Sequence, residues 1–389
     1  MRRSPGPSRA RALAAILLAA ILLAAATGCQ DPDTEVTQGI FVRYAWEPTL
    51  TPCGGAARTM DAFVPFVRGQ LGLDPEGQDG ISYTWLTQEA YERVEPDRLA
   101  PTSGICHGDT AYGIFPVMVH EMVHAVDPSG GGGRFFIEGM AVAFAPDLAG
   151  GDRYRRRDPR PYLTADFTAD PETKDNLYQR GGAFVAYLVG RHGPARFLEL
   201  RDRLSMTASE DRIRRVFADV YGADLDDEVE FFLSDACPDE ASELPIPHAC
   251  EGEAVPWVSA REWRDVRAID CDDASAVGGI GETFSQASVA VTLEVPEAGA
   301  YELRRFGEPD GAATLVSCGR CAWLAWDRAL SAVGQIAALE PGRYALIHRV
   351  DAASLGLSGV RILRVPEHDA DLGLGGGTDA TGGADTDGG

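Results

Sequence analysis

The stretch VMVHEMVHAV constrains the fold more than any other part of the sequence. His120 and His124 lie four residues apart, so on an α-helix their side chains share one face. Two imidazoles at this spacing can bind one metal ion, and Glu121 would then lie beside the open coordination position. We therefore predict a helix over residues 116–126. The alternative interpretation is an amphipathic helix whose two histidines bind no metal.

A catalytic zinc site needs a third protein ligand and leaves one position open for water. Glu138, in the stretch FFIEGMAVAF, lies fourteen residues after His124, beyond a glycine-rich reversal. A second helix, predicted over residues 135–144 and folded back antiparallel, would bring this carboxylate to the histidines. The sequence thus predicts one zinc ion held by His120, His124 and Glu138.

Roles for the neighbouring residues follow from the chemistry of such a site. Glu121 would act as general base, taking a proton from water and passing it to the leaving amine. Asp127 lies one turn past His124 and could orient that imidazole from the second shell. The alternative for Asp127 is a residue that ends the helix before Pro128.

Hydrophobic spacing predicts a mixed α+β domain over residues 40–237, with a small N-terminal sheet followed by a helical lobe. We expect strands over 41–46 and 81–86, and helices over 56–71, 178–191, 195–204, 213–221 and 225–234.

A segment rich in proline and acidic residues, 238–256, is interpreted as a linker. Beyond it the residue pattern changes from one typical of helices to one typical of strands. Strands with alternating or β-branched residues are expected beyond it, over 288–295, 300–306, 343–350 and 359–365. They predict a β-sandwich domain over 257–366. The tail, 367–389, contains mostly Gly, Asp and Thr and is expected to be disordered.

The N-terminus has the pattern of an export signal. Arginines precede an apolar run, and small residues end at Cys29, so residues 1–28 are interpreted as a signal peptide. The ATGC ending is similar to a bacterial lipobox, which predicts lipidation of Cys29 and a tether over 29–39. The protein is expected to be exported and anchored by lipid to the cell envelope. Gln30 favours the outer membrane; ordinary secretion is the alternative.

Export sets the chemistry of the cysteines. Seven of the eight follow Cys29, and in an oxidising compartment they are disulfide candidates, with one left over. Cys318 and Cys321 form a CGRC pair, for which we favour structural bridging over zinc or redox work. A net charge of −24 argues against nucleic acid as a partner. No role is assigned to His107; four more histidines are expected in surface or packing positions: His192, His248, His348 and His368.

HEMVH followed by IEGMA resembles the gluzincin zinc metallopeptidases, in which a downstream glutamate is the third ligand. The stretch YQRG, which begins at Tyr178, is similar to the Tyr-x-Lys-Gly of the aminopeptidase N branch, with Arg180 in place of lysine. In that branch the tyrosine hydrogen-bonds the developing oxyanion, which implies the same role for Tyr178. Tyr112 is a weaker alternative.

The resemblance covers roughly residues 40–235, whose helical end is similar to bacterial peptidase-MA-like domains. It implies a zincin-like fold. The C-terminal third is weakly similar to secreted β-sandwich accessory domains. Two features depart from the aminopeptidases: the gap between HExxH and the glutamate is shorter, and their Gly-x-Met-Glu-Asn stretch is not found upstream.

These observations predict zinc-dependent hydrolysis of peptide bonds at the bacterial cell envelope, with a protein or peptide as substrate. One alternative is a peptidase-like fold that is catalytically weak or inactive and serves as a binding or adhesion module. Another is a metal-dependent hydrolase of a different bond.

Overall fold

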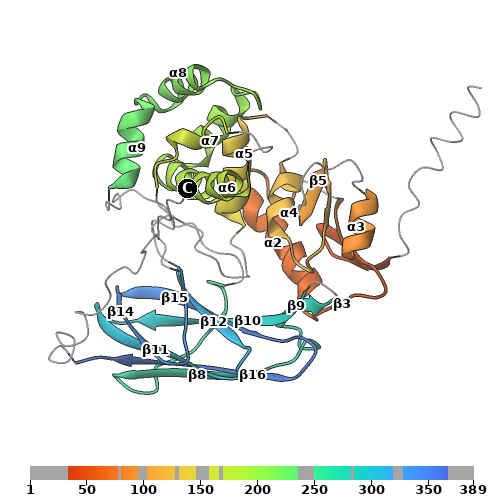
Figure 1. Ribbon diagram of the computed structural model, residues 1–389, viewed down its shortest axis with the longest axis vertical. Coiled ribbons are helices and arrows are strands. Elements are labelled where there is room, and N and C mark those ends of the chain that lie inside the picture. Colours follow the sequence, from red (N-terminus) through yellow and green to blue (C-terminus); the bar gives the residue numbers. More distant parts are fainter. Residues whose placement is uncertain are drawn as a thin grey trace, which may run out of the picture.

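The computed structural model describes residues 34–77, 80–94, 103–127, 131–145, 157–165, 170–234, 249–281, 284–318 and 327–366. The predicted signal peptide, the lipidation site Cys29 and the tail lie outside them, as do His248, His368, Cys237 and Cys321. The described chain has a mixed α+β fold: an N-terminal mixed sheet with helices, then antiparallel sheets that form a β-rich C-terminal part (Figure 1). Across the described residues, no helix has the length and apolar character needed to cross a membrane.

The N-terminal sheet has five strands in the order β1-β2-β4-β6-β5. The inner strands β2 (Val42–Trp46), β4 (Ile81–Trp85) and β6 (Thr110–Gly113) run parallel, while β1 (Glu35–Gln38) and β5 (Gly104–His107) are antiparallel to their neighbours. Strands β2 and β4 confirm the prediction from aromatic and branched residues. Strand β1 corrects the expected tether over 29–39, because its residues pair with β2.

Helices surround this sheet and then form a lobe of their own. Helix α2 (Ala56–Gln70) contacts β2, and α3 (Gln88–Val94) follows β4. The lobe contains η1 (Arg160–Tyr162), α5 (Arg134–Phe144), α6 (Pro171–His192), α7 (Pro194–Asp202), α8 (Glu210–Tyr221) and α9 (Leu225–Leu233). All the predicted helices of residues 40–237 are present.

Helix α6 begins seven residues before the predicted start at 178. Asp170 caps it, since its Oδ1 accepts a hydrogen bond from the Thr173 N–H at 3.0 Å, and Pro171 occupies the first turn. The missed turn is therefore stabilised by its cap, and its polar residues lack the apolar spacing on which the prediction relied.

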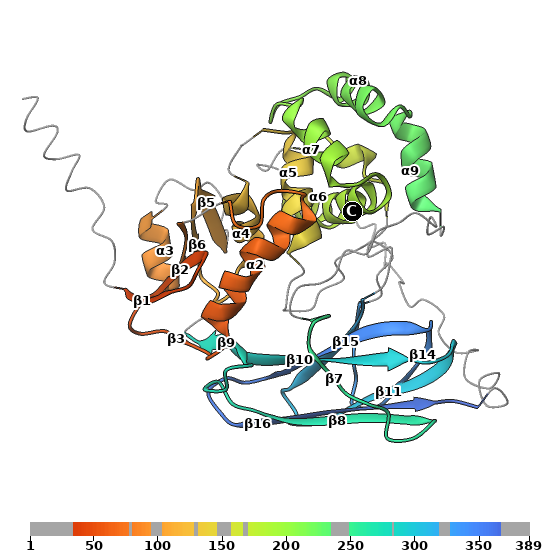
Figure 2. The same cartoon turned by 180° about the vertical axis from the view of Figure 1, so that it is seen from behind.

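The C-terminal part contains two sheets (Figure 2). One has the order β13-β12-β15-β10-β9-β3, with β7 beside β10, and the other the order β14-β11-β16-β8. Their strands are β7 (Glu253–Ala254), β8 (Glu262–Ile269), β9 (Val277–Ile280), β10 (Ser285–Val295), β11 (Gly299–Gly307), β12 (Ala312–Ser317), β13 (Asp327–Ala329), β14 (Gln335–Leu339), β15 (Gly342–Val350) and β16 (Gly356–Arg364). The four strands expected from the sequence are β10, β11, β15 and β16.

Side chains from both sheets form one buried core, which includes Trp263, Leu293, Tyr301, Leu346 and Ile362. The expected linker over 238–256 needs correction at its end, because residues 253–254 form β7 and Cys250 is bonded to Cys318. The Cys250–Cys318 disulfide agrees with the structural role favoured for Cys318.

The two halves of the chain are joined within a sheet as well as by a disulfide. Strand β3 (Thr51–Pro52) belongs to the N-terminal half but pairs with β9 in the C-terminal part. Next to it, Cys53 is bonded to Cys271. Among the described residues Cys106 is a free cysteine. Two disulfides are typical of proteins outside the cytoplasm.

Candidate metal site

Helix α4 (Val119–Val126) carries the two histidines, and the N-terminal sheet holds the segment that leads into it. Three rings on β2 and β4 donate hydrogen bonds to consecutive carbonyls: Tyr44 to Pro116 at 2.7 Å, Tyr83 to Phe115, and Trp85 to Ile114 at 3.1 Å. The helix therefore starts three residues later than the predicted 116, since the preceding backbone is bonded to the sheet. This segment fixes where α4 begins.

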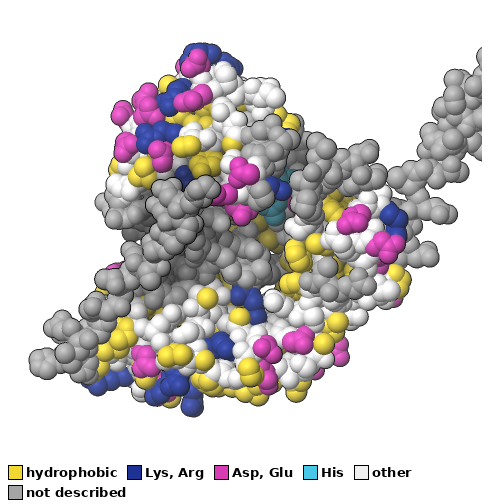
Figure 3. Space-filling view, in the orientation of Figure 1, with side chains coloured by type: hydrophobic (Ala, Val, Ile, Leu, Met, Phe, Trp, Pro, Cys, Tyr) yellow, Lys and Arg dark blue, Asp and Glu magenta, His cyan; other side chains and the backbone are white. Residues whose placement is uncertain are grey.

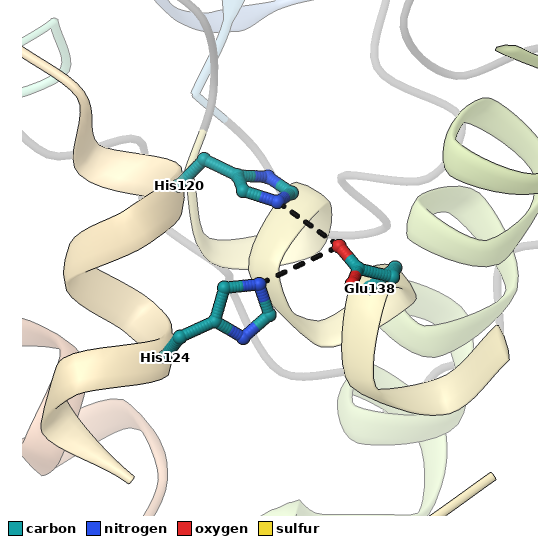
Figure 4. Close-up of side chains that lie close together, drawn as sticks. All are labelled: His120, His124 and Glu138. Atoms are coloured by element: carbon teal, nitrogen blue, oxygen red, sulfur yellow. Dashed lines mark hydrogen bonds and ion pairs between the residues drawn. The ribbon is translucent and has the colours of Figure 1, made fainter. Parts of the chain in front are cut away.

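The structure brings the three predicted ligands together (Figure 4). His120 Nε2 lies 3.1 Å from Glu138 Oε2, and His124 Nε2 lies 3.4 Å from the same oxygen. The ligand atoms of all three residues lie within 4.8 Å of one another. Their side chains are 24%, 18% and 18% exposed, and histidine is visible in the hollow between the helical lobe and the N-terminal half (Figure 3). The cluster is thus compact and reachable from solvent.

The charges of the three side chains in this cluster are coupled. Burial alone would raise the pKa of Glu138, but hydrogen bonds from both imidazoles and their charge lower it far below its ordinary value. Burial alone would lower the pKa of His124, yet the hydrogen bond and charge of Glu138, with the charge of Glu121, raise it. The carboxylate is therefore ionised at neutral pH and faces two nitrogen donors.

Two imidazole nitrogens and one carboxylate oxygen are a donor set that suits a divalent metal, and three protein ligands leave coordination positions open. His120, His124 and Glu138 could therefore hold a metal ion. The sequence predicted this group from the spacing of the histidines and from one glutamate on the following helix.

Glu121 lies between the two histidines in sequence and is 9% exposed. Its side chain packs against β5: a Cβ at Gly104 would lie 2.7 Å from Glu121 Cγ and 2.8 Å from Oε1. Glycine at this position therefore allows the strand to approach the carboxylate. The sequence alone does not indicate a role for Gly104, because strand β5 is too short to show a clear pattern.

Two glycines allow α5 and α6 to pack closely beside the ligands. A Cβ at Gly139 would lie 2.7 Å from the Gly181 carbonyl oxygen, and one at Gly181 would lie 3.1 Å from the Phe135 carbonyl oxygen. Gly139 follows Glu138, and Gly181 ends the YQRG stretch. Close contact between the two helices thus explains why glycine occupies both positions.

Tyr178 lies near the histidines: its ring centroid is 5.6 Å from that of His120. Lys174, one turn earlier on α6, lies 5.9 Å from the centre of the Tyr178 ring. Tyr112, the weaker alternative, packs instead with Leu86, Ala90 and Tyr91, in a cluster separate from the core that includes α4. The structure thus places the ring of Tyr178 next to a predicted ligand.

Asp127 has a partner that the sequence did not indicate. Its Oδ2 accepts a hydrogen bond from Nη1 of Arg201, which lies on α7 and is 3% exposed. The predicted contact between Asp127 and His124 stays a prediction. Arg201 could not be found from the sequence, since it lies 74 residues from its partner and resembles the many other arginines of the chain.

Two other histidines are bonded to acids away from this cluster. His192 Nε2 lies 2.9 Å from Glu228 Oε1 in the helical lobe. His348, fully buried, has Nδ1 2.9 Å from Ser358 Oγ and Nε2 3.1 Å from Asp265 Oδ2. These packing roles agree with the prediction. His107 lies at the end of β5 and is exposed.

No protein-family model matches the chain, and no curated protein matches it in sequence. Among solved structures, the chain is similar to Aeromonas hydrophila PliG, a periplasmic lysozyme inhibitor of g-type lysozyme, with 12% identity over 28% of this chain and 95% of that chain and a TM-score of 0.17. It is also similar to a family GH115 4-O-methyl-alpha-glucuronidase, with 10% identity over 64% of this chain and 41% of that chain and a TM-score of 0.15. Likenesses this weak support no statement about fold family or function.

Proposed function

We propose that this protein is a zinc-dependent hydrolase of peptide bonds, of the gluzincin type. The observation that carries the proposal is the convergence of His120, His124 and Glu138 around one point, with Glu121 beside two of them in sequence. A site built only for structure would use a closed set of four ligands, whereas these three leave room for water and substrate.

The chemistry assigned to the residues follows from their positions. A zinc ion bound by these ligands would lower the pKa of water and polarise a carbonyl group. Glu121 would accept the proton of the attacking water and pass it to the leaving amine. Tyr178, close to His120, would donate a hydrogen bond to the oxyanion as it develops.

A peptide is favoured over other substrates by the position of β5. This strand ends the order of the N-terminal sheet in the described part of the chain, and its Gly104 packs on Glu121. Extended peptides can bind by adding a strand to the edge of a sheet. A substrate bound along β5 would therefore pass beside the proposed general base.

The finer assignments rest on the sequence. The mixed sheet, the HExxH helix and the helical lobe support a zincin-like domain, and the two facing sheets support a β-sandwich accessory domain. We further propose lipidation at Cys29 and attachment to the outer membrane, for which the lipobox-like stretch and Gln30 are the support.

The test is cleavage of an unfolded protein, such as reduced casein, by the purified mature protein. Glu121→Gln should retain zinc and lose about 10²–10⁴-fold in kcat, because the carboxylate that takes the proton is gone. Glu89→Gln, at an exposed position of α3, is the matched control and should keep full activity.

Three results would count against parts of the proposal. Full activity of Glu121→Gln would show that Glu121 is not the general base. Zinc binding without turnover of any protein substrate would favour the binding-module alternative. Turnover of another class of ester or amide, with none of peptides, would leave the metal site but exclude a peptidase.

A further inference from the structure

Arg201 occupies a position where three segments around the candidate metal site meet. Its Nη1 donates to Asp127 Oδ2, at the C-terminal end of α4, and lies 3.5 Å from Met140 Sδ on α5. Its Nη2 donates to Asp202 Oδ1 at 2.9 Å, on its own helix α7. One guanidinium group thus contacts both ligand-bearing helices.

Gly132, just before α5 in the glycine-rich segment, packs on the same side chain. Gly132 has a φ of +122°, and a Cβ there would lie 2.3 Å from Arg201 Cγ. The Gly132 N–H donates to the Leu204 carbonyl oxygen at 3.0 Å, just past the end of α7. The described end of this segment, which leads into α5, therefore packs against Arg201, and only glycine fits at position 132.

Burial of this arginine calls for an explanation beyond stability. Its side chain is 4% exposed, and Nε has no hydrogen-bond partner among the described residues. Replacing a buried ion pair with apolar side chains often leaves a protein equally stable, so such a pair is weak evidence for a stabilising role. A planar guanidinium can, however, hold two carboxylates in fixed directions, which an ammonium group cannot do.

The two partners of Arg201 on α4 and α5 lie close in sequence to candidate metal ligands. Asp127 lies three residues after His124, and Met140 lies two residues after Glu138. We propose that Arg201 is a positioning residue: it holds the end of α4 against α5 and thereby keeps His124 and Glu138 at the spacing a metal ion requires. The inference rests on the proposed metal site and adds a residue that acts through Asp127 and Met140, not as a ligand.

Zinc affinity, measured by competition with a chromogenic chelator, tests the proposal without any substrate. Arg201→Lys and Arg201→Met should each weaken zinc binding about 10–100-fold, the usual effect of losing a group that orients metal ligands. Arg203→Met is the matched control: Arg203 lies at the end of the same helix but pairs at the surface with Glu199 and Asp219, so zinc affinity should not change.

Thermal unfolding of the metal-free proteins separates positioning from folding. Affinities are compared only well below each melting temperature, where every variant is folded, and Arg201→Lys retains the charge if Arg201→Met unfolds. Asp127→Asn should weaken zinc binding as well, and the double variant with Arg201→Lys should lose less than the product of the two single losses, because both remove one contact.

The outcomes separate this inference from the proposed function. If the wild type binds zinc and folded Arg201→Lys and Arg201→Met bind it equally well, the positioning role is wrong and the metal site stands. If the wild type binds no zinc, the metal site is wrong and the role of Arg201 is wrong with it.

Discussion

At the scale of single residues, the sequence contained enough to find the three candidate ligands but little of what surrounds them. His120 and His124 were predictable because the helical repeat places residues four apart on one face. Glu138 was predictable because a glycine-rich reversal follows the histidine helix and Glu138 lies on the next helix. Gly104 and Arg201 were not, since both act through segments distant in the sequence and neither residue type signals such a contact.

Tyr178 provides a prediction at this scale. Tyr178→Phe keeps the ring beside His120 but removes the hydroxyl, so a donor to the oxyanion is lost while the zinc ligands are unchanged. We expect kcat to fall about 10²–10³-fold, with zinc content unaltered. Steady-state kinetics on the unfolded protein substrate, together with metal analysis, checks this. A kcat within threefold of the wild type, about the spread of such effects, would exclude Tyr178 from the reaction.

At the scale of elements, helices with a clear apolar face were predicted well, whereas the four-residue strands β5 and β6 were not. Helices α2, α8 and α9 each show a clear apolar face. Strands β5 and β6, with four residues each, are too short for an alternating pattern to stand out. The predicted start of α4 was wrong because the true start depends on hydrogen bonds from side chains of β2 and β4 to the backbone before the helix. Local sequence does not encode this tertiary contact.

The contact of α5 with α6 provides the second prediction. Gly181→Ala adds a Cβ that would lie 3.1 Å from the Phe135 carbonyl oxygen and 3.2 Å from Gly139 Cα, so the backbone of α5 must shift slightly to make room for it. We expect a loss of about 1–3 kcal/mol in the free energy of unfolding, with weaker zinc binding, because Glu138 lies on α5. Thermal unfolding and chelator competition measure both effects.

Gly69→Ala is the matched control, because a Cβ on this helical glycine of α2 would meet no atom within 4 Å. Alanine there should leave stability equal or raise it by up to about 1 kcal/mol. If Gly181→Ala behaves like Gly69→Ala, close helix packing is not what places Glu138.

At the scale of the whole molecule, the sequence indicated two parts but not how they join. The composition changes where the β-rich part begins, and that change was visible. The pairing of β3 with β9, and the disulfide across 218 residues, were not visible, because both depend on residues far apart in the chain. The seven-stranded sheet therefore includes residues from the N-terminal half, and a boundary drawn from composition alone omits them.

The Cys53–Cys271 disulfide gives a prediction at this scale. The double variant Cys53→Ser, Cys271→Ser should lose about 2–5 kcal/mol in the free energy of unfolding, since a bond that closes a long loop restricts the unfolded chain most. Calorimetry should show the single unfolding transition broaden or split as the halves lose this cross-link. An unchanged melting temperature would show that the cross-link adds nothing to the stability of the fold.

The central claim is that one metal ion binds between α4 and α5, and metal analysis of the purified mature protein tests it most directly. After dialysis against a weak chelator, elemental mass spectrometry should find about one zinc per chain in the wild type. Glu138→Gln should lower this occupancy strongly, and His120→Ala with His124→Ala should abolish it, while all the variants remain folded. A wild type free of zinc, or equal zinc in the double histidine variant, would contradict the account.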